Sequence, residues 1–136
     1  MVAGLDRRFG WSPDFSLLMN CFGIFLLVSG YILSSYALIA NRFFSGTVRL
    51  QEERGHHPVS DGHYRWMRHP GYSGSLLSSI GIPLLLGSAR AFIMVRVALV
   101  ILVTRTRLED RFLQENLPGY REYAQRARFR LLPGIW

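Results

Sequence analysis

The sequence predicts an all-α integral membrane protein, with one long transmembrane helix followed by a tight transmembrane helical hairpin. The 27 residues 15–41 carry no charge, and a helix of that length crosses a hydrocarbon layer of about 30 Å. A second apolar stretch, residues 72–104, is divided into two shorter helices by a turn at Gly87-Ser88. Arginines border both stretches, which is typical of segments beside a membrane.

Composition indicates the class of partner. The 136 residues suit a single membrane domain, 1–136, and the net charge of +7 rests on 16 basic residues, all of them arginine. In a soluble chain this charge would suggest nucleic acid, but arginines next to apolar spans are explained by membrane topology. We therefore expect a lipid bilayer as partner and no nucleic acid. Cys21 is the only cysteine, which excludes an internal disulfide and a multi-cysteine zinc site.

The first half of the chain holds a lead-in, a helix and a connector. Residues 1–14 are polar and rich in turn formers, so we expect an irregular lead-in. The first transmembrane helix is assigned to residues 14–41. Residues 42–70 form a polar connector that glycine and proline punctuate, so no long helix is expected there. The small residues of the first helix, which would let another helix approach closely, are Gly23, Gly30 and Ser34.

The second half holds the hairpin and a polar tail. The hairpin is assigned to residues 71–104, and Arg96 within it is expected to face protein or headgroups rather than lipid. Residues 105–136 are assigned to a helix extension, ending near Asn116, and a tail. In this tail, residues 120–132 have the pattern of an amphipathic helix suited to the membrane surface. The small residues of the hairpin's first helix are Gly74, Ser78 and Gly81.

The distribution of arginines predicts the orientation. The connector carries five arginines and the segment from residue 105 onward carries seven, whereas the opposite side carries three. By the positive-inside rule, residues 42–70 and 105–136 face the cytoplasm, so we expect a multi-pass protein of the inner, cytoplasmic membrane. A site can then form between these two segments on the cytoplasmic side.

Residues 62–74, GHYRWMRHPGYSG, are the strongest candidate for a binding segment. They combine arginine and histidine donors with aromatic rings, immediately before an apolar helix. Pro70 suits the first turn of that helix, whose N–H groups would favour an anionic ligand group. The alternative is a basic-aromatic belt that only anchors the helix at the headgroups.

Arg105 and Glu109 lie four residues apart, on one face of the emerging helix. They form either a simple surface ion pair, or a pair in which Arg105 holds an anionic substrate group and Glu109 holds a cofactor. His56 and His57 are poor metal ligands together because neighbours in sequence seldom bind one ion, and we expect no metal.

Two motifs resemble the isoprenylcysteine carboxyl methyltransferase family. Residues 68–74, RHPGYSG, resemble its RHPxYxG signature, and Arg105 with Glu109-Asp110, followed by spaced tyrosines, resembles its second signature. The closing LLPGIW is similar to bacterial members. The resemblance implies an integral membrane enzyme that uses S-adenosylmethionine without a Rossmann domain. It also implies a lipophilic or lipidated acceptor that is methylated on a carboxylate.

The resemblance also implies roles for individual residues. Arg105 falls on the position that faces the substrate carboxylate, so Arg105 and Glu109 are the residues expected to carry catalysis. The residues on cofactor-contact positions are Gln51, His56, His57, Pro58, Val59, Tyr64, His69, Pro70, Gly71, Tyr72 and Glu109. Gln51 matches only if the loop is shorter here.

Three departures from the family pattern bear on these expectations. His63 stands where proline is usual, and Asp110 replaces the second glutamate at a position expected to be secondary. Family members also carry further transmembrane helices ahead of this segment, so we expect a truncated or minimal form. A second copy or another helix would then take the place of the absent helices.

Three other functions remain open. An ethanolamine-lipid methyltransferase would need a base for its amine, whose pKa is near 10, and His69 or Glu109 would have to supply it. A sterol-reductase-like protein would bind a nicotinamide cofactor in a similar C-terminal region. An inactive membrane module is the third alternative.

Overall fold

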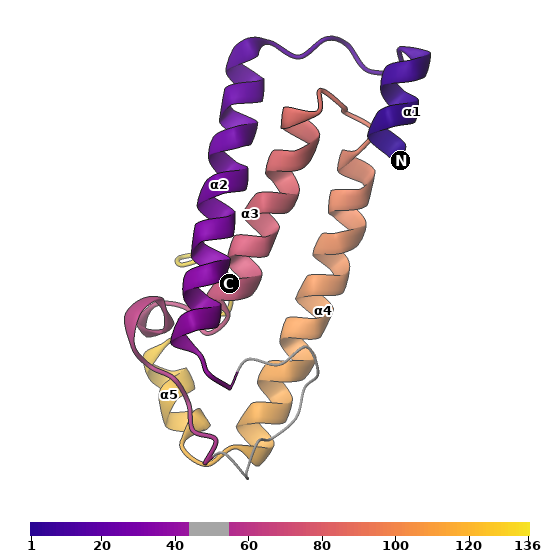
Figure 1. Cartoon of the computed structure of the whole chain (residues 1–136). Helices are drawn as coiled ribbons and strands as arrows, with labels where there is room; N and C mark the ends of the chain where they lie inside the picture. Colours follow the sequence, from indigo (N-terminus) through magenta and orange to yellow (C-terminus); the bar gives the residue numbers. More distant parts are fainter. Residues whose placement is uncertain (44–54) are drawn as a thin grey trace.

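The computed structural model describes residues 1–43 and 55–136, and within these residues the fold is all-helical, as predicted. Three long helices lie side by side as an elongated bundle, with α1 at one end and α5 at the other (Figure 1). A 3-10 helix, η2 (Gly62–Arg65), precedes α3. The α-helices are α1 (Val2–Phe9), α2 (Leu17–Ala40), α3 (Pro70–Leu85), α4 (Phe92–Asn116) and α5 (Tyr120–Arg126).

Helix α2 is the candidate membrane span. The Ser16 hydroxyl caps its first turn by accepting a hydrogen bond from the Met19 backbone N–H at 3.3 Å. Its 24 residues carry no charge, and among the described residues it is the one helix long and apolar enough to cross a bilayer. Helix α3 has 16 residues, and α4 carries charged residues along its length. Membrane crossing by this hairpin stays a prediction.

Helices α2 and α3 touch through the small residues that the sequence singles out. A Cβ atom added to Gly30 would collide with the carbonyl oxygen of Gly74, and one on Gly74 would lie 2.5 Å from the carbonyl oxygen of Gly30. A second pair of glycines, further along the same two helices, is equally close, because a Cβ atom on Gly81 would lie 2.6 Å from the carbonyl oxygen of Gly23. The two backbones are therefore in direct contact, which only glycine allows at these positions.

Serine hydroxyls add hydrogen bonds across the same interface. Ser34 donates to the carbonyl of Gly71 at 3.0 Å, and Ser78 donates to the carbonyl of Leu27 at 3.2 Å. These bonds fix the height of α3 against α2 and hence the position of residues 68–72 at the end of the bundle.

The predicted irregular lead-in is wrong, because residues 2–9 form helix α1. This helix is held by Asp6, which is 1% exposed. Ser12 donates to the Asp6 carboxylate at 2.6 Å and Ser88 donates to the same oxygen. The backbone N–H of Ala89 donates to Ser12 at 2.9 Å. Helix α1 thus closes the α3–α4 turn, through tertiary contacts that a local pattern does not reveal.

Acid should release α1 from this turn. The hydroxyls of Ser12 and Ser88 lower the pKa of Asp6, so its stabilising contribution is complete above the unfolded value of about 3.9 and is lost as the pH falls through the folded value. Hydrogen exchange of the α1 amides should accelerate in that acidic window, and Asp6→Asn should show the fast exchange already at neutral pH. The exposed Asp14→Asn is the control. Equal protection in Asp6→Asn and wild type would contradict this role.

The tail contains less helix than predicted. Helix α5 ends at Arg126, and the chain then turns back along the segment before α3. The backbone N–H groups of Arg68 and His69 donate to the carbonyls of Phe129 and Arg130, each at 2.9 Å. The apolar face assigned to the membrane surface is instead buried inside the protein, so that expectation is wrong. Its members are Tyr120, Tyr123, Ala127 and Leu131.

Arg96 does not face protein, one of its two expected environments. Its side chain is exposed on the outer surface of α4, one turn from the start of that helix. Helix α4 ends as predicted at Asn116, and Gly119, with φ of 78°, starts α5 in the left-handed region that glycine adopts readily.

Candidate functional site

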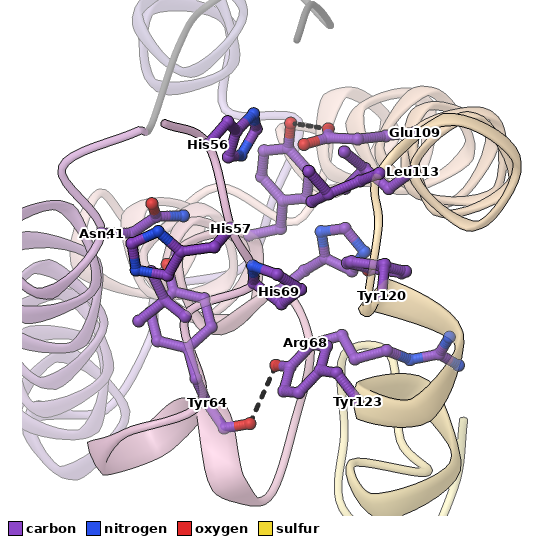
Figure 2. A pocket seen from close by; sticks show the side chains of 15 residues that line it. Asn41, His56, His57, Tyr64, Arg68, His69, Glu109, Leu113, Tyr120 and Tyr123 are labelled. Atoms are coloured by element: carbon purple, nitrogen blue, oxygen red, sulfur yellow. Dashed lines mark hydrogen bonds between the residues drawn. The ribbon is translucent and has the colours of Figure 1, made fainter. Parts of the chain in front are cut away.

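A pocket lies at the α5 end of the bundle, where the connector, α3, α4 and α5 meet. Its empty volume is about 540 Å³, including the part open to solvent. Figure 2 shows His57 and Tyr64 on one side and Glu109, Leu113 and Tyr120 on the other. The lining residues are Asn41, His56, His57, Pro58, Val59, Tyr64, Arg68, His69, Gly71, Tyr72, Glu109, Leu113, Leu117, Tyr120 and Tyr123.

The Tyr72 hydroxyl links Arg105 to Glu109. It donates to Glu109 Oε2 at 2.6 Å and accepts from Arg105 Nε at 2.9 Å. The Arg105 guanidinium also lies over the Tyr72 ring, 5.6 Å from its centroid. Since Arg105 and Glu109 are one turn apart on α4, a single phenol from α3 orients both side chains.

His69 presents an unused polar atom at the pocket wall. Its ring stacks on Tyr72, with centroids 5.6 Å apart and planes at 6°. Nε2 is buried and has no hydrogen-bond partner among the described residues, because its nearest carboxylate oxygen, Asp110 Oδ1, is 3.9 Å away. A buried ring nitrogen in this situation suits a ligand atom.

Asp110 is the centre of the polar network behind the pocket. It is 1% exposed, and its carboxylate accepts from Arg68 Nη1 at 2.6 and 2.9 Å. Tyr120 donates to Oδ1 at 3.0 Å, and Arg130 Nε and Gln114 Nε2 each donate to Oδ2 at 2.9 Å. One carboxylate thus joins α4 to the signature segment, α5 and the tail.

Charges and burial set the protonation states of this network. Burial by itself raises the pKa of Asp110, but the nearby His69 ring, with Nε2 3.9 Å from Oδ1, together with Arg130 and Arg68 outweighs it and holds that pKa well below its usual range. Burial raises the pKa values of Tyr64, Tyr120 and Tyr123. At neutral pH the carboxylate is therefore ionised and the three phenols remain proton donors. Tyr123 uses its proton on the carbonyl of Tyr64 at 2.8 Å (Figure 2).

The structure brings together most of the residues expected at a cofactor site. Pro70 does not line the pocket but is the first residue of α3, as predicted. Arg105 does not line the pocket either, but it donates a hydrogen bond to Tyr72, which does. Gln51 lies outside the described residues. The expected residues that line the pocket are His56, His57, Pro58, Val59, Tyr64, His69, Gly71, Tyr72 and Glu109.

The network also contains residues that sequence reasoning did not assign to the site. The sequence marks Arg68 only as a donor within residues 62–74 and as part of the signature, and Asp110 only as a secondary position, whereas the structure pairs the two as a buried ion pair. Arg130 and Gln114 complete the shell of Asp110. The signal was present in part, since Gln114 lies one turn after Asp110 on α4, but nothing in the spacing connects Asp110 to Arg68.

Comparison with known proteins agrees with the two motifs. The model of the isoprenylcysteine carboxyl methyltransferase family matches residues 23–115. The chain is 36% identical over 111 residues to protein-S-isoprenylcysteine O-methyltransferase B of Arabidopsis thaliana, covering 78% of this chain and 55% of that protein. It is 29% identical over 108 residues to a probable protein-S-isoprenylcysteine O-methyltransferase of Oryza sativa subsp. indica, covering 77% and 56%.

A relative from Schizosaccharomyces pombe, also a protein-S-isoprenylcysteine O-methyltransferase, is 36% identical over 64 residues, covering 47% of this chain. The chain spans about half the length of the two plant relatives. The matched residues 23–115 include α3 with the signature segment before it, and Arg105, Glu109 and Asp110 on α4. The chain therefore belongs to the isoprenylcysteine carboxyl methyltransferase family, whose members are integral to membranes.

Proposed function

We propose that the chain transfers a methyl group from S-adenosylmethionine to the carboxylate of a lipophilic acceptor of the isoprenylcysteine type. The observation that carries the proposal is that residues of both motifs converge on one pocket, namely His69, Gly71, Tyr72 and Glu109. The names of the plant and yeast relatives support the same reaction and the same class of acceptor.

The donor and acceptor groups of the pocket fit S-adenosylmethionine. The rings of His56, His57 and Tyr64 offer faces for a purine. Glu109 suits a ribose hydroxyl or the amino group, and the buried Nε2 of His69 suits the carboxylate in the tautomer protonated at that nitrogen. These residues would hold the cofactor with its amino group near Glu109 and its carboxylate near His69.

The proposed reaction requires little acid–base catalysis by the residues of the chain. When bound, S-adenosylmethionine supplies a methyl group activated by the positive sulfur. A carboxylate acceptor, with a pKa of about 4, is ionised at neutral pH, so no general base is needed. The chain's task is to align the acceptor and exclude water. Arg105, held in place by Tyr72, offers its guanidinium to the acceptor carboxylate.

A membrane arrangement follows from the same proposal. We infer that α2, α3 and α4 cross the bilayer and that the pocket end faces the cytoplasm, supported by the arginines that gather beyond residue 105. Single cysteines at Ser60 and Gln125, in a chain with Cys21 replaced, should resist an impermeant reagent in intact cells. If the reagent labels these cysteines from outside the cell, the pocket end faces outward and the proposed orientation is wrong.

Binding and turnover together test the proposed reaction. The folded protein in nanodiscs should bind S-adenosylhomocysteine in calorimetry, and should esterify a farnesylated cysteine derivative that has a free carboxylate. Phosphatidylethanolamine as acceptor and reduced nicotinamide as ligand are the control compounds. A folded protein that binds no S-adenosylhomocysteine would refute the proposal.

Two variants on α4 should separate the roles of its charged pair. Glu109→Gln should weaken S-adenosylhomocysteine binding by about 1–3 kcal/mol, the usual cost of a lost charged hydrogen bond. Arg105→Lys keeps the charge but loses the planar fork, so turnover should fall while that affinity barely changes. Calorimetry and initial rates measure the two effects. Unchanged affinity and rate in both variants would leave the pair with a structural role only.

A further inference from the structure

A second hollow lies on the other side of Asp110 from the candidate pocket. It is open to solvent and spans about 810 Å³, including that open part. Four arginines line it, Arg107, Arg111, Arg121 and Arg130, together with Asp110 and Glu115. Four positive groups therefore face two negative ones, and Asp110 is also neutralised by Arg68 from behind. The hollow has a positive excess that a ligand anion would offset.

The guanidinium groups are held with their outer ends available. Among the described residues, the hydrogen bonds of three of these arginines all leave from Nε. Arg111 donates to Glu115 at 2.8 Å, Arg121 to the Gln114 carbonyl at 2.8 Å, and Arg130 to Asp110 at 2.9 Å. Bonds of this kind fix each side chain and leave its two terminal NH₂ groups for a further acceptor.

Trp136 orders the remaining side of the hollow. The guanidinium carbon of Arg107 lies 5.4 Å from the centroid of the Trp136 ring, and that of Arg130 lies 5.1 Å from it. The indole thus holds an arginine of α4 and an arginine of the tail near each other. Two positive groups held together in this way lose little side-chain entropy when they bind a shared anion.

The geometry points to a binding site for a phosphate group in this hollow, supplied by an anionic lipid headgroup or by a soluble phosphate compound. Planar arginine forks bind phosphate oxygens in a bidentate manner, and a phosphate group has enough oxygens and negative charge to engage several guanidinium groups at once. The apolar part of α4 ends at Thr104, and Arg107 is only three residues further along the helix. In the proposed membrane arrangement the hollow therefore lies at the level of the lipid headgroups. The site is separate from the pocket proposed for S-adenosylmethionine and does not depend on it.

If these arginines only orient the chain in the membrane, their effect depends on their total charge and not on their positions. A phosphate site instead depends on the arginines that line the hollow, so variants inside and outside the hollow distinguish the two explanations. Arg107→Gln and Arg121→Gln each remove one positive charge from the hollow without breaking the bonds of Asp110. Arg126→Gln removes the same charge from exposed α5 outside the hollow and is the matched control. Arg130 is left intact because its loss would disturb Asp110.

Binding is measured in two arms that distinguish the sources of phosphate. In neutral detergent, calorimetry follows inorganic pyrophosphate added at constant ionic strength. In nanodiscs, the melting temperature is compared between phosphatidylcholine alone and phosphatidylcholine mixed with phosphatidylglycerol. We expect binding or a raised melting temperature in at least one arm. The Arg107 and Arg121 variants should lose about 5- to 100-fold in affinity or most of the melting shift, and Arg126→Gln should keep both.

Each outcome bears on the phosphate site alone, since no methyl transfer is measured. A response in detergent assigns the site to soluble phosphate compounds, and a response only in nanodiscs assigns it to lipid headgroups. No response in either arm overturns the site. A loss in Arg126→Gln equal to that in Arg121→Gln also overturns it, because the effect would then come from overall charge.

Discussion

Replacing Asp110 with asparagine should lower the free energy of unfolding by about 3–5 kcal/mol, the usual cost of leaving a buried partner charge uncompensated. Arg68 is 8% exposed and cannot turn to water when its carboxylate partner is removed. Asparagine keeps the shape of the side chain, so the loss reports charge rather than packing. Thermal or denaturant unfolding in detergent, followed by circular dichroism, measures it.

Glu115→Gln provides the matched control on the same helix. Glu115 pairs with Arg111, but the two side chains are 52% and 79% exposed, so the change should cost less than about 1 kcal/mol. Because the folded pKa of Asp110 lies below the unfolded value of about 3.9, the difference between wild type and Asp110→Asn should persist down to that pH and shrink in stronger acid. Equal losses in the two variants would contradict a central role for Asp110.

Gly74→Val should separate α2 from α3. A Cβ atom at this position would lie 2.5 Å from the carbonyl oxygen of Gly30 and 2.5 Å from the Ser34 hydroxyl. Backbone cannot yield as a flexible side chain does, so the cost should reach or exceed the upper end of the roughly 1–3 kcal/mol known for overpacked sites. Unfolding in detergent gives the stability, and disulfide trapping between cysteines placed on α2 and α3 gives the separation.

Gly4→Ala is the control that tests whether the loss of stability in Gly74→Val comes from the contact between α2 and α3. A Cβ atom on Gly4 would meet nothing within 4 Å, and α1 is helical there. Alanine in an open helical position should be neutral or stabilising by up to about 1 kcal/mol. Wild-type stability in Gly74→Val would show that α3 can shift along α2 without loss.

The sequence predicts the long elements of this fold because their signals are local. A charge-free run defines α2, and small residues on two helices predict that these helices touch. Helix α1 escapes prediction because its eight residues depend on Asp6 and Ser88, which are 82 positions apart. Helix α5 is predicted too long because the pattern of its apolar face continues past Arg126, where the backbone leaves the helix to pair with residues 68–69.

The sequence predicts many of the residues at the candidate site, but it does not predict the hydrogen bonds that connect them. The motifs identify Tyr72 and Glu109, and spacing along α4 places Arg105 beside Glu109. No local pattern shows that the Tyr72 phenol joins them, or that Asp110 is the more deeply buried acid of the pair. Such contacts depend on how α3 stands against α4, which is set by packing over the whole bundle.

The order of synthesis constrains when the pocket can exist. Helices α2 and α3 meet through glycines that all precede Leu85, so they can associate while α4 is still being translated. Arg68 and His69, by contrast, wait for the carbonyls of Phe129 and Arg130, which are translated after the whole of α4 and α5. The helices are thus in place before any ligand can be held. A chain stopped before Phe129 would retain the α2–α3 pair and lack the wall that completes the pocket.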